Sequence, residues 1–288
     1  MGGFVSSGLT RRAALAGAVS ALANAATAAE ASGQLAQIER QAGGRLGVFA
    51  IDTRNERSLA WRPDERVLMC STFKLLAAAA VLARIDAGRE RPDRPIAFSA
   101  TDLLATSPVT GAHVKEGALP LEALCQAAVE ESDNTAANLL LKALGGPEAL
   151  TRFTRSLGDP TTRHDRYEIA LNFADGVLDT TSPRAMTSSA RKLLLGDTLS
   201  PASRKKLEGW MRADKRGAKR IRAGAPKAWT GGSKPGTSDV QTNDVAILRP
   251  PGRAPILVAA FYASPPAPLE AREAVLRQVG EAVARWAG

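Results

Sequence analysis

A serine and a lysine three residues apart are the first residues in this sequence that could do chemistry together. Ser71 and Lys74 stand at the start of an apolar run, residues 75–82. A helix that is apolar on every side is buried, and a buried lysine is costly unless it is paired or functional. Residues i and i+3 share a helix face, so a deprotonated Lys74 could take the proton of the Ser71 hydroxyl. On this motif alone, a helix cap at Ser71 with Lys74 extended into solvent explains the pattern equally well.

Ser132 and Asn134 offer a second pair of polar groups. Together with Asp133 they separate two predicted helices, at residues 121–131 and 135–144. These residue types favour a turn and a helix cap. They also suit a site, because a hydroxyl can relay a proton and a side-chain amide can bind a substrate.

Residues 234–237, with the sequence Lys-Pro-Gly-Thr, lie on a predicted strand. Lys234 offers a second cation, and Thr237 offers a backbone N–H near the same cleft. Ser71, at a helix N-terminus, has further N–H groups and the positive end of the helix dipole beside it. Such donors suit the oxyanion that forms when a serine attacks a carbonyl.

Glu168 and Asn172 form a fourth group. They are four residues apart in the segment 166–172, so one helical turn directs both side chains to one spot. There they could hold and activate a water molecule. The alternative is an ordinary surface turn that contains a glutamate.

Taken in order, these motifs resemble those of a known superfamily. The S-x-x-K of residues 71–74, the S-D-N of residues 132–134 and the segment 234–237 are similar to the motif set of serine β-lactamases and penicillin-binding proteins. The segment around Glu168 resembles the Ω-loop of class A β-lactamases, which penicillin-binding proteins lack. The resemblance covers nearly the whole chain after residue 28.

The resemblance implies a catalytic cycle. Ser71 would attack the β-lactam carbonyl, and Lys74, or Glu168 through a water, would remove its proton. Ser132 would pass a proton to the leaving nitrogen with help from Lys234, and a water activated by Glu168 would hydrolyse the acyl-enzyme. The implied function is hydrolysis of penicillin- and cephalosporin-type antibiotics, hence antibiotic resistance, with no metal and no cofactor. A DD-peptidase and a non-hydrolysing β-lactam sensor domain are the alternatives, and both would remain acylated.

The resemblance also implies a binding set. The N–H groups of Ser71 and Thr237 would form the oxyanion hole. Arg222 stands where many family members place an arginine behind the substrate carboxylate. The alternative, that Arg222 is one more exposed arginine of a basic stretch, explains its presence equally well. Arg166 and Asp179 would close the neck of the Ω-loop as an ion pair. The residues expected to bind substrate are Asn134, Asn172, Arg222, Gly236 and Thr237.

Two positions depart from the family pattern. Pro235 stands where relatives usually have a threonine whose hydroxyl helps to bind the substrate carboxylate. Thr106 replaces an aromatic residue that often walls the site. Residues two apart on a strand point their N–H groups the same way, so Pro235 breaks no ladder bond if the Thr237 N–H faces an open cleft. We therefore expect the strand to survive and the affinity for the carboxylate to weaken.

The elements that must position these residues follow from hydrophobic periodicity and turn signals. Strands joined by short turns favour an antiparallel sheet. We predict an α+β fold, in which an antiparallel five-stranded sheet is flanked by terminal helices and carries a large inserted all-helical region. The α/β part spans about 29–62 and 214–288, and the helical part about 63–213. The predicted strands are residues 45–52, 57–61, 229–237, 244–249 and 255–263, and the terminal helices are residues 31–41 and 269–286.

Residues 1–28 have the composition of an export signal. Arg11 and Arg12 precede an apolar run, residues 13–23, and two Ala-x-Ala sites follow. A charged region, a short apolar region and small-residue cleavage sites are typical of a signal peptide. The arginine pair resembles a twin-arginine signal. We expect residues 29–288 to be exported to the periplasm.

The composition excludes several classes of protein. The chain has 288 residues, of which 44% are hydrophobic and 23% charged, as in soluble globular proteins. The net charge of +9 comes without a nucleic-acid-binding signature, so no nucleic-acid partner is expected. Histidines and cysteines lack metal-ligand spacing, and no segment after residue 28 is apolar enough to insert stably into a membrane. We expect a monomer that acts on a small-molecule β-lactam.

The two cysteines, Cys70 and Cys125, are expected to be free thiols. Cys70 is held at the start of the Ser71 helix, and Cys125 sits in the middle of another. A disulfide needs Cα atoms within about 7 Å, whereas the axes of packed helices lie about 8–10 Å apart. Bridging is thus possible only if these two turns face each other directly.

Overall fold

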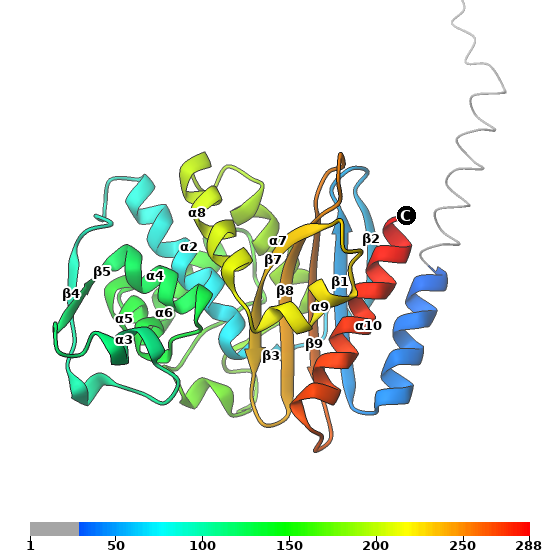
Figure 1. The fold of residues 1–288 in the computed structure, drawn as a ribbon, viewed down its shortest axis with the longest axis horizontal. Coiled ribbons are helices and arrows are strands. Elements are labelled where there is room, and N and C mark those ends of the chain that lie inside the picture. Colours follow the sequence, from blue (N-terminus) through cyan, green and yellow to red (C-terminus); the bar gives the residue numbers. More distant parts are fainter. Residues whose placement is uncertain (1–28) are drawn as a thin grey trace, which may run out of the picture.

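Five antiparallel strands form the central sheet, in the spatial order β2–β1–β9–β8–β7 (Figure 1). The structure is a computed structural model that describes residues 29–288, so the export signal predicted for residues 1–28 lies outside the described residues. Strand β7 lies at one edge of the sheet and faces the helical part of the molecule. The strands of the sheet are β1 (Arg45–Asp52), β2 (Arg57–Trp61), β7 (Thr230–Thr237), β8 (Gln241–Arg249) and β9 (Ile256–Ala263).

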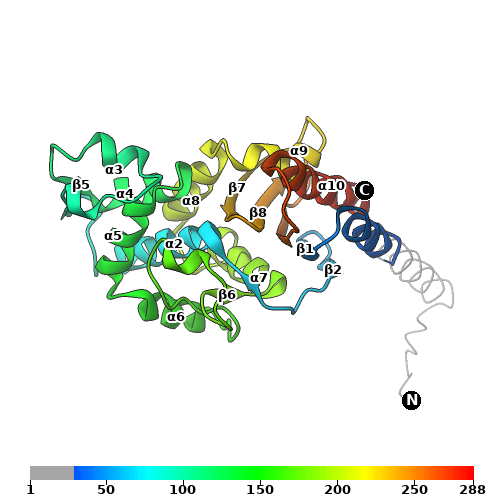
Figure 2. The ribbon, with the colours of Figure 1, turned by 90° about the horizontal axis from the view of Figure 1, so that it is seen from below.

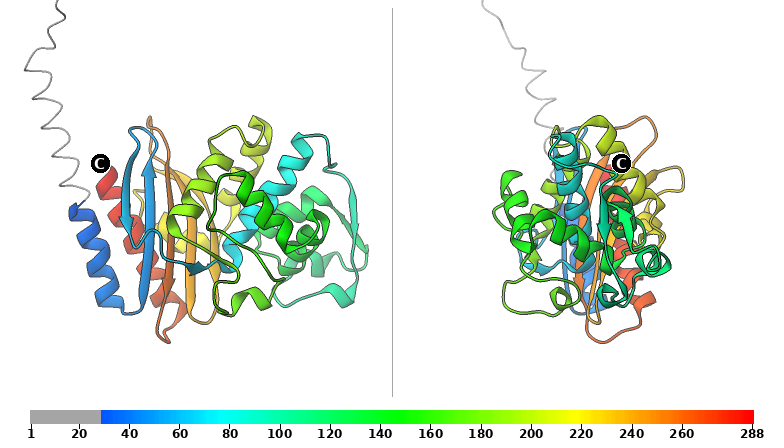
Figure 3. Two further views of the ribbon diagram at one scale, coloured as in Figure 1. Left: turned by 180° about the vertical axis from the view of Figure 1, so that it is seen from behind. Right: turned by 90° about the vertical axis from the view of Figure 1, so that its left-hand side faces the viewer.

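Both faces of the sheet are covered. Leu248 and Val258 point to one face and join the apolar cluster of the two terminal helices, residues 29–42 and α10 (Leu269–Ala287). These helices lie side by side, as Figures 1 and 3 show. Ile247 points to the opposite face and joins the larger apolar cluster of the helical region. The alternation of side chains along a strand thus divides the core into two layers.

Helix α2 (Phe73–Asp86) is the axis of the helical region (Figure 2). Residues 73–82 are all buried, because α4, α5, α6 and α8 pack around this helix. The uninterrupted apolar run after Lys74 is therefore explained by its surroundings. The other helices are α3 (Pro108–Ala112), α4 (Leu121–Glu130), α5 (Asn134–Leu144), α6 (Pro147–Ser156), α7 (Pro183–Leu194), α8 (Pro201–Ala213) and α9 (Ile221–Gly224).

The predicted fold is confirmed in its architecture and in most of its element boundaries. Strands β1 and β2 have the predicted bounds, and β8 begins three residues earlier than predicted. The description of the insertion as all-helical is wrong in one respect, because it contains two short ribbons. These pair strands of two or three residues, which are too short to show an alternating pattern in the sequence. The ribbons join β3 (Val67–Leu68) to β6 (Thr180–Thr181) and β4 (Pro95–Ala97) to β5 (Ala118–Pro120).

Between residues 29 and 288, no helix is long and apolar enough to cross a membrane. Within the same residues, no group of three or more histidine, cysteine, aspartate or glutamate side chains is arranged to hold a metal ion. The two histidines lie on different parts of the fold. His113 follows α3 and is exposed near Glu116, whereas His164 is buried ahead of the Ω-loop.

Cys70 and Cys125 are free thiols in the structure, and neither side chain is exposed. Cys70 lies in η1 (Cys70–Thr72), the short 3-10 helix that leads into α2, and Cys125 lies within α4. Burial raises the pKa of the Cys70 thiol to about 12 and also raises the pKa of Cys125. Both groups are therefore protonated at neutral pH, and protonated thiols are poor nucleophiles.

We predict two free thiols per chain. Thiol titration of the denatured, unreduced protein should give two, and the native protein should react slowly because both groups are buried and protonated. A count of zero, with an intact mass two protons lower, would show that the cysteines form a disulfide.

Candidate active site

A cavity of about 180 Å³ opens where the helical region meets the edge strand β7. Its wall combines residues from both parts of the fold, and most of them come from the four motifs singled out in the sequence. The lining residues are Ser71, Thr106, Ser132, Asn134, Asn172, Arg216, Arg220, Pro235 and Thr237.

Ser71 is held at the cavity by the segment that precedes it. The N–H of Met69 donates to the carbonyl of Asp179 at 3.1 Å, and the Met69 carbonyl accepts from Asn243 Nδ2 at 3.2 Å. Both neighbours of Ser71 in η1 are fully buried, whereas Ser71 itself is partly exposed and lines the cavity. The turn therefore presents one hydroxyl to the cavity at the N-terminus of α2.

Lys74 is completely buried and faces four oxygen atoms. Its Nζ donates to the carbonyl and Oγ of Ser132 at 2.9 and 3.5 Å and to Asn134 Oδ1 at 2.5 Å, and it lies 3.0 Å from Glu168 Oε1. Burial lowers the pKa of Lys74, and the facing carboxylate offsets this only in part. The alternative in which Lys74 extends into solvent is wrong, because its side chain is 0% exposed.

Asp133 holds the loop between α4 and α5 in place. Its carboxylate caps α5 by accepting from the N–H of Ala136 at 2.8 Å, and it also accepts from the N–H groups of Val109 and Thr110 at 3.0 and 2.9 Å. With Asp133 fixed in this way, its two neighbours, residues 132 and 134, both line the cavity. Both interpretations of this motif therefore hold: Asp133 forms the turn and caps the helix, and Ser132 and Asn134 line the cavity.

Glu168 and Asn172 meet as their spacing predicts. Asn172 Nδ2 donates to Glu168 Oε2 at 2.7 Å, while the other carboxylate oxygen faces Lys74. The backbone of Glu168 is fixed by Asn138, whose side chain accepts from its N–H at 2.9 Å and donates to its carbonyl at 3.0 Å. The sequence analysis missed Asn138, although it lies four residues after Asn134 and so shares a face of α5.

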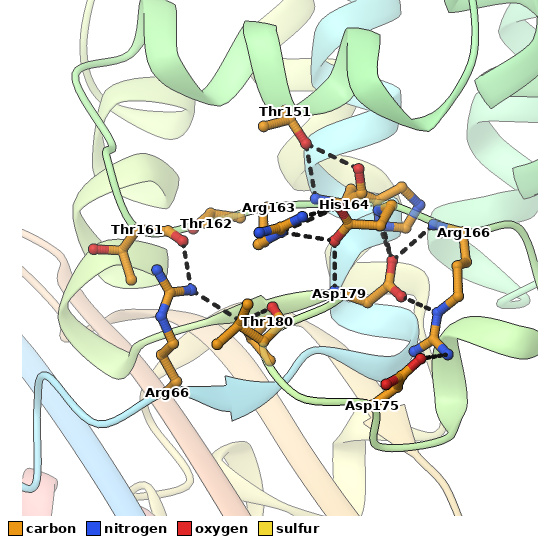
Figure 4. Close-up of polar contacts among 12 residues, drawn as sticks. Arg66, Thr151, Thr161, Thr162, Arg163, His164, Arg166, Asp175, Asp179 and Thr180 are labelled. Atoms are coloured by element: carbon orange, nitrogen blue, oxygen red, sulfur yellow. Dashed lines mark hydrogen bonds and ion pairs between the residues drawn. The ribbon is translucent and has the colours of Figure 1, made fainter.

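The predicted ion pair at the neck of the Ω-loop is confirmed (Figure 4). Arg166 Nε lies 2.6 Å from Asp179 Oδ2. The other oxygen of Asp179 accepts from the N–H groups of Asp165 and Arg166 at 2.8 and 3.0 Å. Because the carbonyl of Asp179 also accepts from Met69, one residue anchors both the loop and the segment before Ser71.

Lys234 lies on β7 with its side chain fully buried. Its Nζ makes no hydrogen bond within the described part of the chain and lies 4.0 Å from Asp214 Oδ2. Burial lowers the pKa of Lys234 to about 7 and raises the pKa of Asp214. Pro235 pairs with Asp244 in an unbroken strand, so the expectation that β7 survives the proline is confirmed.

Gly236 marks the closest approach of the sheet to η1. A Cβ at this position would lie 2.8 Å from the carbonyl oxygen of Met69 and 3.2 Å from Cys70 Cβ. Only glycine allows such a separation without a shift of the backbone. Gly236 is not among the residues that line the cavity, so the geometry supports a role in spacing the two segments.

The structure does not bring Arg222 to the cavity, contrary to the expectation from the sequence. Its guanidinium donates to the carbonyl of Arg212 at 3.2 Å and to the carbonyl of Asp214. Helix α9 begins at Ile221, and the side chain of Arg222 contacts the end of α8 rather than the cavity.

Arg220 takes the place at the cavity that was expected for Arg222. Its side chain is buried, and its guanidinium donates to the carbonyls of Gly236 and Asn243 at 2.9 and 2.7 Å and to Thr237 Oγ1 at 2.7 Å. Its Nε donates to Glu273 at 3.3 Å. Arg220 thus braces the end of β7 at which Thr237 lines the cavity.

Comparison with known proteins gives one consistent result. A family model described as the beta-lactamase enzyme family matches residues 30–287. The chain is 45% identical over 242 residues to a β-lactamase of Streptomyces albus G, which covers 81% of this chain and 77% of that protein. It is 44% identical over 234 residues to the carbapenem-hydrolysing β-lactamase KPC of Klebsiella oxytoca, covering 80% of each.

Solved structures agree with the sequence relatives. A β-lactamase from Burkholderia vietnamiensis has 56% identity and a TM-score of 0.88, covering 89% of this chain and 96% of that one. An ancestral class A β-lactamase, GNCA, has 53% identity and a TM-score of 0.85, covering 88% and 98%. The chain belongs to the class A β-lactamase family. As a class A β-lactamase it hydrolyses β-lactam antibiotics, an activity that confers resistance to them.

The β-lactamase buries His164 beneath its Ω-loop. The ring stacks on Phe73, with centroids 4.3 Å apart, and neither ring nitrogen makes a hydrogen bond among the described residues. Its Nδ1 lies 3.6 Å from Asp179 Oδ1. Burial lowers the pKa of His164 to about 4, even though the nearby carboxylate favours the charged form. The folded protein therefore holds this histidine neutral.

We predict that His164 makes the β-lactamase sensitive to mild acid. Between pH 6.5 and 4 the unfolded chain binds a proton at this residue and the folded chain does not, so stability falls as the pH falls. His164→Phe keeps a ring against Phe73 and removes the titrating group. Urea unfolding at pH 7 and pH 4.5 should show a smaller loss of stability in the variant than in the wild type. Equal losses in the two proteins would contradict the assignment.

Proposed function

We propose that hydrolysis proceeds through an acyl-enzyme on Ser71, with Lys74 and Glu168 acting as a coupled base. The observation that carries this proposal is the contact between Lys74 Nζ and Glu168 Oε1, which is 3.0 Å long with both side chains fully buried. Both groups contact residues of the cavity wall, because Lys74 donates to Asn134 and Glu168 accepts from Asn172. At this distance a proton can pass directly between the amine and the carboxylate.

Acylation begins when Ser71 Oγ attacks the lactam carbonyl carbon. The serine proton passes to the Lys74–Glu168 pair, and the N–H groups of Ser71 and Thr237 stabilise the oxyanion. The C–N bond then breaks, and the nitrogen takes a proton from Ser132, which regains one from the Lys74–Glu168 pair through Lys74 Nζ, 3.5 Å from Ser132 Oγ. Lys234, buried beside the cavity wall, supports that transfer with its charge.

Deacylation depends on Glu168. Asn172 and Glu168, joined at 2.7 Å, hold a water that attacks the ester carbonyl, and Glu168 takes its proton. The ester C–O bond breaks, and the proton taken by Glu168 passes to Ser71 Oγ, which restores the free enzyme. This step separates the proposal from a DD-peptidase or a β-lactam sensor, since neither of these turns over the acyl-protein rapidly.

The remaining polar groups bind substrate. Asn134 Nδ2 donates to the carbonyl of Ala105 at 2.8 Å, and this bond holds the side-chain amide at the cavity wall. There the amide would contact the side chain of the substrate. Thr237 and Arg220 lie at the opposite wall, toward the substrate carboxylate. We assign no substrate contact to Arg222, because it does not line the cavity and its guanidinium donates to the backbone carbonyls of Arg212 and Asp214.

The proposal also covers the setting in which the enzyme works. Residues 1–28 would act as a twin-arginine export signal, and residues 29–288 would act in the periplasm as a monomer. The substrate is a small-molecule β-lactam, with no nucleic-acid partner. Neither a metal nor a cofactor has a part in the proposed steps.

Ser71→Ala should abolish both turnover and covalent labelling by penicillin. We expect kcat to fall by at least about 10³-fold, because the nucleophile itself is lost. Ser132→Ala is the matched control, since it removes the other serine hydroxyl that lines the cavity. That variant should still be acylated, though slowly, as measured by intact-mass spectrometry with benzylpenicillin. Labelling that persists in Ser71→Ala would overturn the assignment.

Glu168→Ala should still be acylated but should deacylate very slowly. Loss of a general base typically costs about 10²- to 10⁴-fold in rate, so the adduct should accumulate after mixing with benzylpenicillin. Glu131→Ala, at an exposed position beyond α4, is the control and should show no adduct at the same time point. Rapid hydrolysis by Glu168→Ala, with only free protein in the mass spectrum, would rule out this role.

A further inference from the structure

Helix α7 borders a second cavity, the α7 cavity, which the catalytic mechanism does not use. It has a volume of about 740 Å³ and lies where α7 passes the end of β1 and the start of β9. Figure 2 shows α7 on the face of the sheet opposite α10. The α7 cavity and the catalytic cavity share no lining residue. A volume of this size is in the range of sites that bind small organic ligands.

Part of the lining of the α7 cavity is apolar. Ile51, Leu195 and Pro255 contribute side chains from the end of β1, the end of α7 and the residue before β9. No aspartate or glutamate is among the residues that line this cavity. An apolar group would therefore lose contact with water here, and an attached anion would meet no like charge in the lining.

Ser188 and Lys192 supply polar groups to the same cavity. They are four residues apart on α7, so they share a face of the helix. Within residues 29–288, the Ser188 hydroxyl makes no hydrogen bond, and Lys192 Nζ donates to the carbonyl of Leu157 alone. Because an ammonium carries three N–H donors, two donors of Lys192 are left for a ligand.

The charge of Lys192 is not matched by a carboxylate in the described part of the chain. Arg191, the other cation of the lining, pairs with Glu56 at 2.7 Å. The wall beside Lys192 is formed by Gly158, where a Cβ would lie 3.3 Å from the ammonium nitrogen. Glycine at this position, with φ at +73°, leaves the approach to Lys192 open.

A smaller cavity of about 240 Å³ adjoins the α7 cavity, since Gly158, Ser188 and Lys192 line both. Its lining includes two carboxylates, Asp64 and Asp159. These would repel an anion that entered the smaller cavity. A ligand held by Lys192 is therefore expected to extend into the α7 cavity.

We propose that the α7 cavity binds an amphipathic monocarboxylate. The acid group would contact Lys192 Nζ and Ser188 Oγ, and the hydrocarbon part would lie on Ile51, Leu195 and Pro255. Seven residues of α7 separate Ser188 from Leu195, which is about 10 Å along the helix axis. A hydrocarbon chain of medium length fits this span. The proposed site is separate from the β-lactam site and its chemistry.

Octanoate is the probe, and NMR chemical-shift titration of the purified enzyme measures its affinity. We expect a Kd of about 1 mM or lower, in line with the affinity per atom of small ligands. Octanol keeps the hydrocarbon contact and loses the ionic one, so it should bind about 3- to 10-fold more weakly. This range lies between the effects of an exposed ion pair and a charge-assisted hydrogen bond.

Lys192→Gln should weaken the binding of octanoate by the same factor of about 3 to 10 and leave octanol within about 2-fold. Ser188→Phe places a ring where the two cavities meet and should abolish saturable binding of both probes. Lys205→Gln is the matched control, because Lys205 is an exposed lysine of α8 that lines neither cavity. Its Kd for octanoate should stay within about 2-fold of wild type. Circular dichroism checks that each variant is folded.

Three results would overturn the proposal. The first is the absence of saturable octanoate binding by the wild type. The second is binding that folded Lys192→Gln and Ser188→Phe retain, or an equal loss of octanoate and octanol affinity in Lys192→Gln. The third is competitive inhibition of benzylpenicillin hydrolysis that is the same in wild type and Lys192→Gln, because octanoate would then occupy the catalytic cavity. A KM for benzylpenicillin that changes less than about 2-fold at saturating octanoate supports the separate site.

Discussion

The buried contact between Lys74 and Glu168 is the interaction on which the site depends. Moving two charged groups out of water costs several kcal/mol for each ion, and their attraction repays this only with good geometry and further hydrogen bonds. Here the lysine also donates to Ser132 and Asn134, and the carboxylate also accepts from Asn172. Loss of either partner would leave an uncompensated buried charge, so helix α2 and the Ω-loop must be placed together.

The Ω-loop and the nucleophile segment share an anchor in Asp179. Its side chain pairs with Arg166 and accepts from the loop backbone, while its carbonyl accepts from Met69, two residues before Ser71. A shift of the loop neck would therefore displace the segment before Ser71 as well as Glu168. The site is assembled from distant parts of the sequence, but a small number of buried polar residues set its geometry.

Much of this arrangement could be predicted from the sequence, because the decisive features are local. The apolar run after Lys74 indicates a buried helix. A buried lysine on the same helix face as a serine indicates a base that can take the proton of the serine hydroxyl. Glu168 and Asn172 have helical spacing, and they do meet. Strand boundaries followed from alternation and turn residues, which the tertiary structure left largely unchanged.

What could not be predicted depends on irregular backbone. Arg216, Arg220 and Arg222 belong to one basic stretch without periodicity, and nothing in their spacing shows which side chain turns toward the sheet. The answer comes from the turn between η4 (Gly217–Lys219) and α9, where the backbone leaves helical geometry at Arg220. Hydrophobic patterning carries no information about such a segment, and the choice among the three arginines was therefore beyond the sequence analysis.

The contact at Gly236 has a consequence for how the enzyme can change. Main chain meets main chain there, since a side chain on residue 236 would collide with the carbonyl of Met69. The separation between the end of β7 and η1 is thus fixed by two backbones, and a side chain at residue 236 would force the sheet away from η1. Variation in substrate range must then arise at the rim, where Thr106 and Arg216 face the cavity and neither side chain supports the fold. Residues at the rim can then change by mutation while the residues of the reaction centre stay the same.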